Sequence, residues 1–376
     1  MRIRDIRAAG LRGQTPEGGW SEELRPEDCV HTLVAVHTDE GVTGLGSVFT
    51  NDGLVKAALA LLEPLYGGEN ALEPERVTEK LRQNSFWLGR GGSLTHAISG
   101  IDIALWDILG KATGQPVGRL LGGRYREKVR PYASILMEEP AAMARKLDGL
   151  RGAGFRAFKI GWGPFGRVSD AKDREIVKAA REAVGPECRL MVDAGGSDAF
   201  WYQGYKWALK TAGMLADYDV YWFEEALRPD NLRDFVELRR HAPVRIAGGE
   251  VLTRRESFTP FLTEGALDIV QPDVTKVGGI TESRRIAWMA QEHGVQLIPH
   301  GWNTAVGLAT DLQLASAFVD TDLVEYIGGS PYVDELISGG WRLDDEGYLA
   351  IPDGPGLGVE LDRSALRRYA AGEALL

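Results

Sequence analysis

From about residue 126 the sequence alternates short β-branched or aromatic runs with amphipathic helical stretches. The helical stretches, such as 170–184 and 281–294, carry acids early and basic residues later, as the helix dipole favours. Eight strand–helix units in roughly 200–250 residues predict a (β/α)8 barrel of the TIM type, because a doubly wound sheet usually has fewer strands. The eight predicted strands are 129–135, 155–161, 189–195, 220–226, 244–250, 267–273, 295–301 and 323–329.

The first 125 residues break this rhythm. Residues 31–50 are typical of a hairpin with its turn at 39–41, and residues 94–114 have a helical pattern. We therefore predict an α+β domain over 1–125, the barrel over 126–355, and a C-terminal segment, 356–376, that returns to the first domain and completes it.

Charge and hydropathy narrow the functional classes. The chain has 43 basic and 54 acidic residues, a net charge of −11, and no Lys/Arg block, which argues against a nucleic-acid partner. We find neither a secretion signal at the N-terminus nor an apolar run approaching the ~18 residues of a membrane span. With two dissimilar cysteines, the sequence predicts a cytoplasmic protein of a reducing compartment.

The second predicted strand has two possible interpretations. It is followed by a G-x-G-x-x-G match at Gly161, Gly163 and Gly166, and the next strand ends in Asp193, where a dinucleotide-binding fold has its ribose-binding acid. The same strand also places Lys159 at what would be the mouth of a barrel. The local sequence leaves both interpretations open.

The strand ends carry the chemistry of such a barrel, because its active site lies at the carboxyl ends of the strands. Any one acid there could equally cap a helix, but several carboxylates at one mouth repel each other unless a cation lies among them. Asp193, Glu224 and Glu250 would give Mg²⁺ three oxygen ligands and leave positions for water and substrate. Seven consecutive strands end in an ionisable residue: Lys159, Asp193, Glu224 with Glu225, Glu250, Asp273, His300 and Glu325.

Asp273 and His300 end the two strands that follow. A carboxylate beside an imidazole fixes its tautomer and raises its basicity, so this pair is a candidate general base. Surface or packing roles suffice for the other histidines, which are His31, His37, His96, His241 and His293.

The ordered set resembles the enolase superfamily and, within it, the mandelate racemase-like subgroup. The likeness covers nearly the whole chain, including 99–123 ("SGIDIALWDILGKATGQPVGRLLGG") and 351–362 ("IPDGPGLGVELD"). It implies a two-part capping domain over a barrel. It also implies one Mg²⁺ held by Asp193, Glu224 and Glu250, with Glu225 as a second choice for the middle ligand. Asp273 and His300 become the catalytic dyad, and Glu325 is the glutamate of the eighth strand.

Two positions refine the resemblance. Asp273 stands where muconate-cycloisomerase-like relatives have a catalytic lysine, and Lys276, three residues later, is not at that position. Strand 155–161 aligns with a Lys-x-Lys strand of which only Lys159 is present, because Gly161 replaces the second lysine. The glycine match is then a coincidence of a Gly-rich loop. Relatives often have an asparagine two residues after the metal-binding aspartate and a proline at the position of Ala226, and both are absent here. The detailed contacts with the substrate are therefore not predicted by the resemblance.

By resemblance, the predicted activity is that of an acid-sugar dehydratase. His300 would remove the proton α to a carboxylate, Mg²⁺ and Lys159 would stabilise the enediolate, and loss of the β-hydroxyl would give a 2-keto-3-deoxy acid. Glu325 would contact the substrate carboxylate or assist as an acid. The alternatives are a racemase, epimerase or sugar-lactone cycloisomerase and, in another class, a catalytically weak metal-dependent binding protein.

The remaining predictions concern the substrate and the assembly. We expect a small sugar acid as the partner and a homo-oligomer as the assembly. Specificity is predicted to lie in loops 13–28 and 47–52, with Trp20 on the first loop and Trp302 on the barrel side as candidate substrate contacts.

Overall fold

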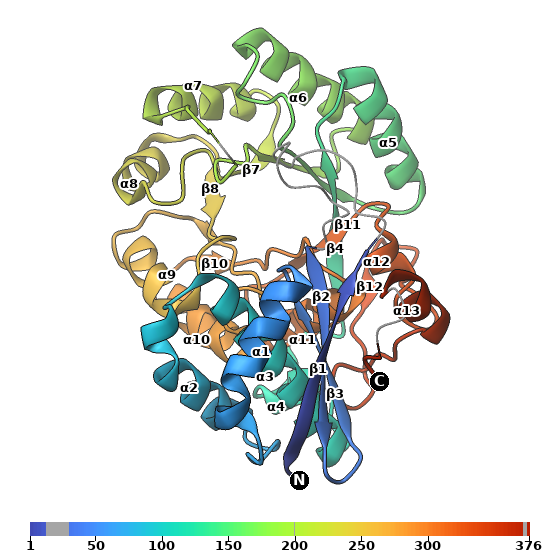
Figure 1. Ribbon diagram of the computed structural model, residues 1–376. Coiled ribbons are helices and arrows are strands. Elements are labelled where there is room, and N and C mark those ends of the chain that lie inside the picture. The colour runs from blue at the N-terminus through green and yellow to red at the C-terminus, as the bar shows by residue number, and fades with distance from the viewer. Residues whose placement is uncertain (13–29, 199, 371–373) are drawn as a thin grey trace.

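The computed structural model describes residues 1–12, 30–198, 200–370 and 374–376. Its N-terminal part is a three-stranded antiparallel sheet, β1-β2-β3, packed against helices, and it lies beside a ring of strands and helices (Figure 1). The predicted hairpin is confirmed as β2 and β3. The elements of this part are β1 (Ile3–Leu11), β2 (His31–Thr38), β3 (Thr43–Val48), α1 (Asp52–Tyr66), α2 (Pro74–Asn84), the 3-10 helix η2 (Phe86–Leu88), α3 (Gly92–Thr113) and α4 (Val117–Leu120).

The ring is a barrel of eight parallel strands, and all eight predicted strands are confirmed. The hydrogen-bonded order runs β10-β9-β8-β7-β6-β5-β4-β11. Side-chain hydrogen bonds from Gln296 and Thr321 connect the two ends of this order. The strands are β4 (Lys128–Leu136), β5 (Ala157–Gly161), β6 (Arg189–Asp193), β7 (Val220–Glu224), β8 (Arg245–Gly248), β9 (Ile269–Val270), β10 (Gln296–Leu297) and β11 (Leu323–Ile327).

Helices between the strands form the outer layer of the ring (Figure 1). The predicted helical stretch 170–184 is confirmed as α6, and Ser169 caps its N-terminus by accepting a hydrogen bond from the Lys172 backbone N–H. The helices are α5 (Pro140–Gly152), α6 (Asp170–Val184), α7 (Tyr205–Ala216), α8 (Leu232–His241), α9 (Arg254–Thr263), α10 (Gly279–Glu292) and α11 (Ala305–Ala317).

The C-terminal segment contacts the N-terminal part. After α12 (Pro331–Asp334) and β12 (Leu349–Ala350), which pairs with β4, comes α13 (Arg363–Tyr369). The Arg12 backbone N–H donates to the Tyr369 carbonyl, and His37 Nε2 lies 3.0 Å from the Leu375 carbonyl oxygen. The predicted fold class, a barrel with an α+β domain completed by the C-terminal segment, is confirmed. The boundaries at 125/126 and 355/356 stay predictions.

The barrel interior contains a layer of buried apolar side chains, one from each strand or the residue after it. Because side chains alternate across a strand, the residue two positions later lies on the same face. Met191 is thus followed by Asp193 on β6, Trp222 by Glu224 on β7, and Ala157 by Lys159 on β5. This alternation places polar residues directly above the apolar floor. The layer consists of Tyr132, Ala157, Met191, Trp222, Ala247, Ile269, Ile298 and Leu323.

In the part of the chain that the structure describes, every helix is too short or too polar to cross a lipid bilayer.

Candidate active site

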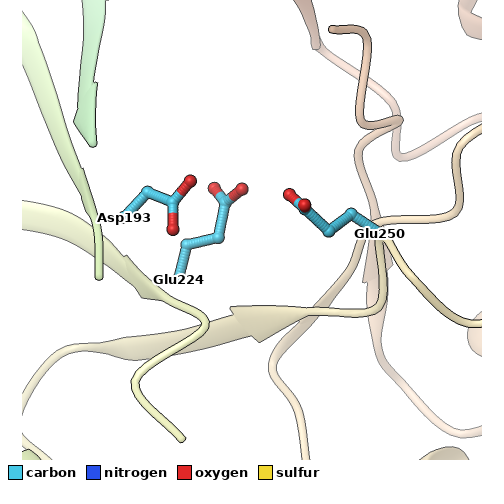
Figure 2. A group of neighbouring side chains, drawn as sticks. All are labelled: Asp193, Glu224 and Glu250. Atoms are coloured by element: carbon cyan, nitrogen blue, oxygen red, sulfur yellow. The ribbon is translucent and has the colours of Figure 1, made fainter. Parts of the chain in front are cut away.

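Three carboxylates meet at the barrel mouth, as the strand ends predict. Asp193 ends β6, Glu224 ends β7 and Glu250 follows β8, and their side chains converge from three neighbouring strands (Figure 2). One oxygen from each lies within 4.8 Å of the others, and all three residues are buried. Hard oxygen donors without sulfur or nitrogen suit Mg²⁺ or a similar hard cation, so the residues present fit such an ion.

The electrostatics of this triad favour a cation. Burial raises the pKa of Asp193 well above its usual range, and the charge of Glu224 raises it further. Burial likewise raises the pKa of Glu224, although Lys159 opposes this shift. Buried acids that repel each other gain most from a positive charge placed among them.

Glu224 and its neighbour Glu225 have separate surroundings. Glu224 Oε2 accepts hydrogen bonds from the Trp222 indole and the Gln271 amide, both at 2.8 Å, which leaves Oε1 directed elsewhere. Glu225 has a φ of 43° and accepts hydrogen bonds from the backbone and hydroxyl of Ser197. Of these two glutamates, the structure places Glu224 in the triad.

Lys159 is buried between the triad and the eighth strand. Its Nζ lies 2.6 Å from Glu224 Oε1, 3.1 Å from Glu325 Oε1 and 3.8 Å from Asp193 Oδ2. Burial would lower the pKa of Lys159, but Glu224 and Glu325 outweigh it and hold the pKa well above its usual value. Lys159 is therefore a cationic hydrogen-bond donor at neutral pH.

Gly161 is packed against the triad. It pairs with Asp193 in the β5/β6 register, and a Cβ on Gly161 would lie 3.0 Å from Asp193 Cβ and 3.2 Å from its Oδ2. A side chain at this position would require Asp193 to shift by a few tenths of an ångström, so glycine lets Asp193 pack directly against β5.

Asp273 and His300 form a hydrogen-bonded pair across adjacent strands. A backbone bridge aligns the two residues, and His300 Nδ1 lies 2.8 Å from Asp273 Oδ2. Burial would raise the pKa of Asp273, but Lys276, His300 and Thr275 together lower it to about 2. An ionised carboxylate only accepts hydrogen bonds, so Nδ1 must donate and Nε2 is the atom free to exchange a proton.

The Nε2 atom of His300 is directed toward the triad, 3.2 Å from Glu250 Oε2. Burial lowers the pKa of His300, but Glu250, Glu325 and Asp273 raise it and prevail over burial and Lys276. The imidazole thus lies beside the metal-type site with its reactive nitrogen toward it. This is the geometry that a general base requires.

Glu325, on β11, lies between the lysine and the imidazole. The Gly301 N–H donates to its Oε2 at 2.7 Å. Burial would raise the pKa of Glu325, but Lys159 and His300 lower it to about 2. In this arrangement Glu325 is an ionised acceptor, and a role as an acid would first require its protonation.

A cavity of about 200 Å³ is lined by five of these groups, Lys159, Asp193, Glu250, His300 and Glu325, whereas Glu224 and Asp273 lie behind its surface. Trp302 contributes to its wall, and its indole N–H has no acceptor among the described residues. Phe49, from the predicted loop 47–52, also lines the cavity. Trp20 and loop 13–28 lie outside the described residues, so their predicted contacts stay predictions.

Lys276 and Trp162 are polar contributors to this cavity that the sequence does not predict. Lys276 is not at the position of the relatives' catalytic lysine, yet its side chain lines the cavity 3.7 Å from Asp273 Oδ2. Trp162, which follows Gly161, donates its indole N–H to Asp193 Oδ2 at 3.1 Å. The only available signal was their proximity in sequence to Asp273 and Lys159.

The fold and the site together define a class of protein: a capped (β/α)8 barrel with an acidic, metal-type cluster and an Asp–His pair at its mouth. Comparisons with known families assign the chain within this class. Residues 142–365 match the family described as "Enolase C-terminal domain-like". Residues 27–122 match the family described as "Mandelate racemase / muconate lactonizing enzyme, N-terminal domain". The chain belongs to the enolase superfamily and is mandelate racemase-like.

Similar proteins of known name are dehydratases and cycloisomerases. The chain is 33% identical to a D-galactarolactone cycloisomerase of Agrobacterium fabrum, over 98% of this chain and 99% of that protein. It is 32% identical to a D-xylonate dehydratase of Haloferax volcanii, over 91% of this chain and 86% of that protein. A crystal structure of the 3,6-anhydro-D-galactonate cycloisomerase from Zobellia galactanivorans superposes with a TM-score of 0.86 at 29% identity, covering 98% of this chain and 99% of that one.

Proposed function

We propose that this protein is a Mg²⁺-dependent acid-sugar dehydratase. It would remove the proton α to a carboxylate and eliminate the β-hydroxyl, giving a 2-keto-3-deoxy sugar acid. The observation that carries this proposal is His300 Nε2, directed toward the Asp193, Glu224 and Glu250 triad while Nδ1 is held by Asp273. A proton acceptor beside a carboxylate-binding metal site suits abstraction of an α-proton.

Each residue of the site has a separate role in the proposed reaction. Asp193, Glu224 and Glu250 would hold the metal, which supplies Lewis-acid polarisation of the substrate carboxylate. His300 accepts the α-proton, and Asp273 orients the ring and stabilises its positive charge. Lys159 donates a hydrogen bond to the carboxylate oxygen on which charge develops.

The proposed elimination of water requires no oxidant or reductant. The α C–H bond breaks and its electron pair forms the enediolate, after which the pair expels the β-hydroxyl. His300, now protonated, can return its proton to that hydroxyl, so water leaves. The enol that remains becomes the 2-keto acid by tautomerisation.

A sugar-lactone cycloisomerase is the second candidate. It is favoured by the single lysine on β5, because the reaction needs one base, and by relatives named as cycloisomerases. In that reaction the proton returns to carbon rather than to a departing hydroxyl. The same residues would serve, with a different leaving oxygen.

The test is a screen of mono- and diacid sugars and their lactones with Mg²⁺. We expect 2-keto acid formation from at least one open-chain acid, detected by semicarbazide absorbance and mass spectrometry. Excess chelator and the His300→Asn variant should both abolish it. A lactone consumed without change in mass would replace the dehydratase by the cycloisomerase, and the absence of turnover on every compound would favour the binding-protein alternative.

A further inference from the structure

Lys276 is a buried cation that the proposed reaction does not use. It lies in the loop after β9, is 6% exposed, and lines the cavity beside the capping domain. Its Nζ lies over the ring of Phe49, 4.3 Å from the centroid. Lys276 and Phe49 therefore form a wall of the cavity separate from the strands that carry the triad.

The ammonium group of Lys276 lacks a hydrogen-bond acceptor in the described part of the chain. The nearest carboxylate oxygen, Asp273 Oδ2, is 3.7 Å away, beyond hydrogen-bond range. Asp273 is already occupied, because Oδ2 contacts His300 and Oδ1 accepts from the backbone and hydroxyl of Thr275. Asp273 and the Phe49 ring compensate part of the Lys276 charge, but its N–H donors gain a hydrogen bond only from a ligand that supplies an acceptor.

Lys159 is less suited to a second carboxylate, because the proposed function already assigns it to the first. Its ammonium is within 3.1 Å of two carboxylates, Glu224 and Glu325, which compensate its charge. Of the two lysines in the described cavity lining, Lys276 is thus the one with no carboxylate oxygen in hydrogen-bond range. An anionic oxygen suits it better than a hydroxyl, because opposite charges add Coulomb attraction to the hydrogen bond.

We propose that Lys276 binds a second carboxylate of the substrate, at the end remote from the carboxylate held at the triad. The preferred substrate is then a dicarboxylic sugar acid or its lactone rather than a monoacid. This inference rests on the proposed function only in that the first carboxylate binds at the triad. It predicts selectivity, whichever of the two reactions follows.

The first test measures binding rather than turnover. Mg²⁺-loaded protein is titrated calorimetrically with malonate, succinate, glutarate and adipate, and with monocarboxylates of the same chain length. Lys276→Met should weaken the best dicarboxylate by about 10- to 100-fold, the range for a lost charged hydrogen bond, while changing monocarboxylate affinity by less than about 3-fold. Lys276→Arg should recover most of the affinity, because it keeps the charge.

Two controls separate this role from a structural one. Lys206→Met removes an exposed lysine and should leave both ligand series unchanged. Lys276→Gln replaces the methionine variant should that one not fold, and Mg²⁺ titration shows that the triad is intact. Equal weakening of mono- and dicarboxylates would overturn the proposal, because Lys276 would then act through Asp273 and His300. No weakening of either series would overturn it as well.

The second test uses turnover. The ratio of kcat/KM for galactarate over galactonate, and for glucarate over gluconate, should favour the diacid in the wild type and fall by about 10-fold or more in Lys276→Met. An unchanged ratio with a measurable rate would refute the inference. Failure of every sugar acid to react would refute the proposed function instead, while the binding result would still decide the role of Lys276.

Discussion

Replacing Glu224 by glutamine tests which of two adjacent glutamates holds the metal. The Trp222 and Gln271 side chains both donate to Glu224 Oε2, so a glutamine would place its carbonyl oxygen there to accept these bonds. Its NH₂ group would then occupy the position of Oε1, next to the Lys159 ammonium. The substitution thus removes a charge and also directs a donor to where the metal needs an acceptor.

The loss should be large. Changing partners outside the ligand shell typically weakens metal binding by about 10- to 100-fold, so losing a direct ligand should exceed about 100-fold. With Mg²⁺ at 100 times the wild-type Kd, binding stabilises the fold by ~2.7 kcal/mol, whereas a 100-fold weaker variant retains ~0.4 kcal/mol. Calorimetric titration gives the affinity, and the Mg²⁺-induced rise in Tm provides an independent measure.

Glu225→Gln is the matched control, because it makes the same chemical change one residue away. Its Oε2 faces Ser197, whose hydroxyl can rotate to suit an amide. We expect its Mg²⁺ affinity to stay within about 10-fold of the wild type, below the effect of losing a direct ligand. If Glu225→Gln lost the metal and Glu224→Gln kept it, the assignment of the triad would be wrong.

Three further predictions follow from the same geometry. His300→Asn should lower 2-keto acid production by ~10²–10⁴-fold while still binding Mg²⁺. Asp273→Asn should lower it less, because this variant only misorients the base. Equal losses of activity in the two variants would contradict the assigned roles. Because Gly161 leaves β5 one lysine, the wild type should not interconvert α-epimers rapidly by NMR; rapid epimerisation abolished by Lys159→Met would show that Lys159 is a second base. Burial raises the pKa of Asp102 to about 7, above its usual 3.8, so between these two pH values the folded state holds a proton that the unfolded state releases. The contribution of Asp102 to the free energy of unfolding should therefore fall as the pH rises from about 4 to 7. Urea unfolding of Asp102→Asn should show a smaller decrease of stability with pH, and an unchanged decrease would refute this attribution.

The barrel could be predicted from the sequence because each strand is a local pattern. A run such as 189–195 contains its own β-branched and apolar residues, and its Asp193 ends the strand whatever the rest of the chain does. Alternation along the strand then places Asp193 on the same face as Met191, inside the barrel. Periodicity along the strands therefore predicts most of the candidate site without any tertiary contact.

The rest of the site depends on contacts between distant segments. Lys276 belongs to a loop, and only the packing of Phe49 from the capping domain against it forms that wall of the cavity. His31, also from the capping domain, is buried near the dyad, and burial lowers its pKa to about 4. It packs edge-on against Phe49 and Tyr332, as the packing role predicted from the sequence requires. No local pattern encodes which residues of two domains meet, so sequence reasoning could not rank Lys276.

In the proposed mechanism, the choice between lyase and isomerase follows from where the proton goes after His300 accepts it. Both reactions begin with one base on one face, which is what the Asp273–His300 pair and the lone Lys159 of β5 provide. Gly161 packs closely against Asp193, and its lack of a side chain leaves Lys159 as the single lysine of β5. The outcome must then depend on the oxygen at the β or more distant carbon and on how the cavity holds it. If Lys276 and Trp302 contact the far end of the substrate, as we propose, changing them should alter the choice of reaction more than changing the base.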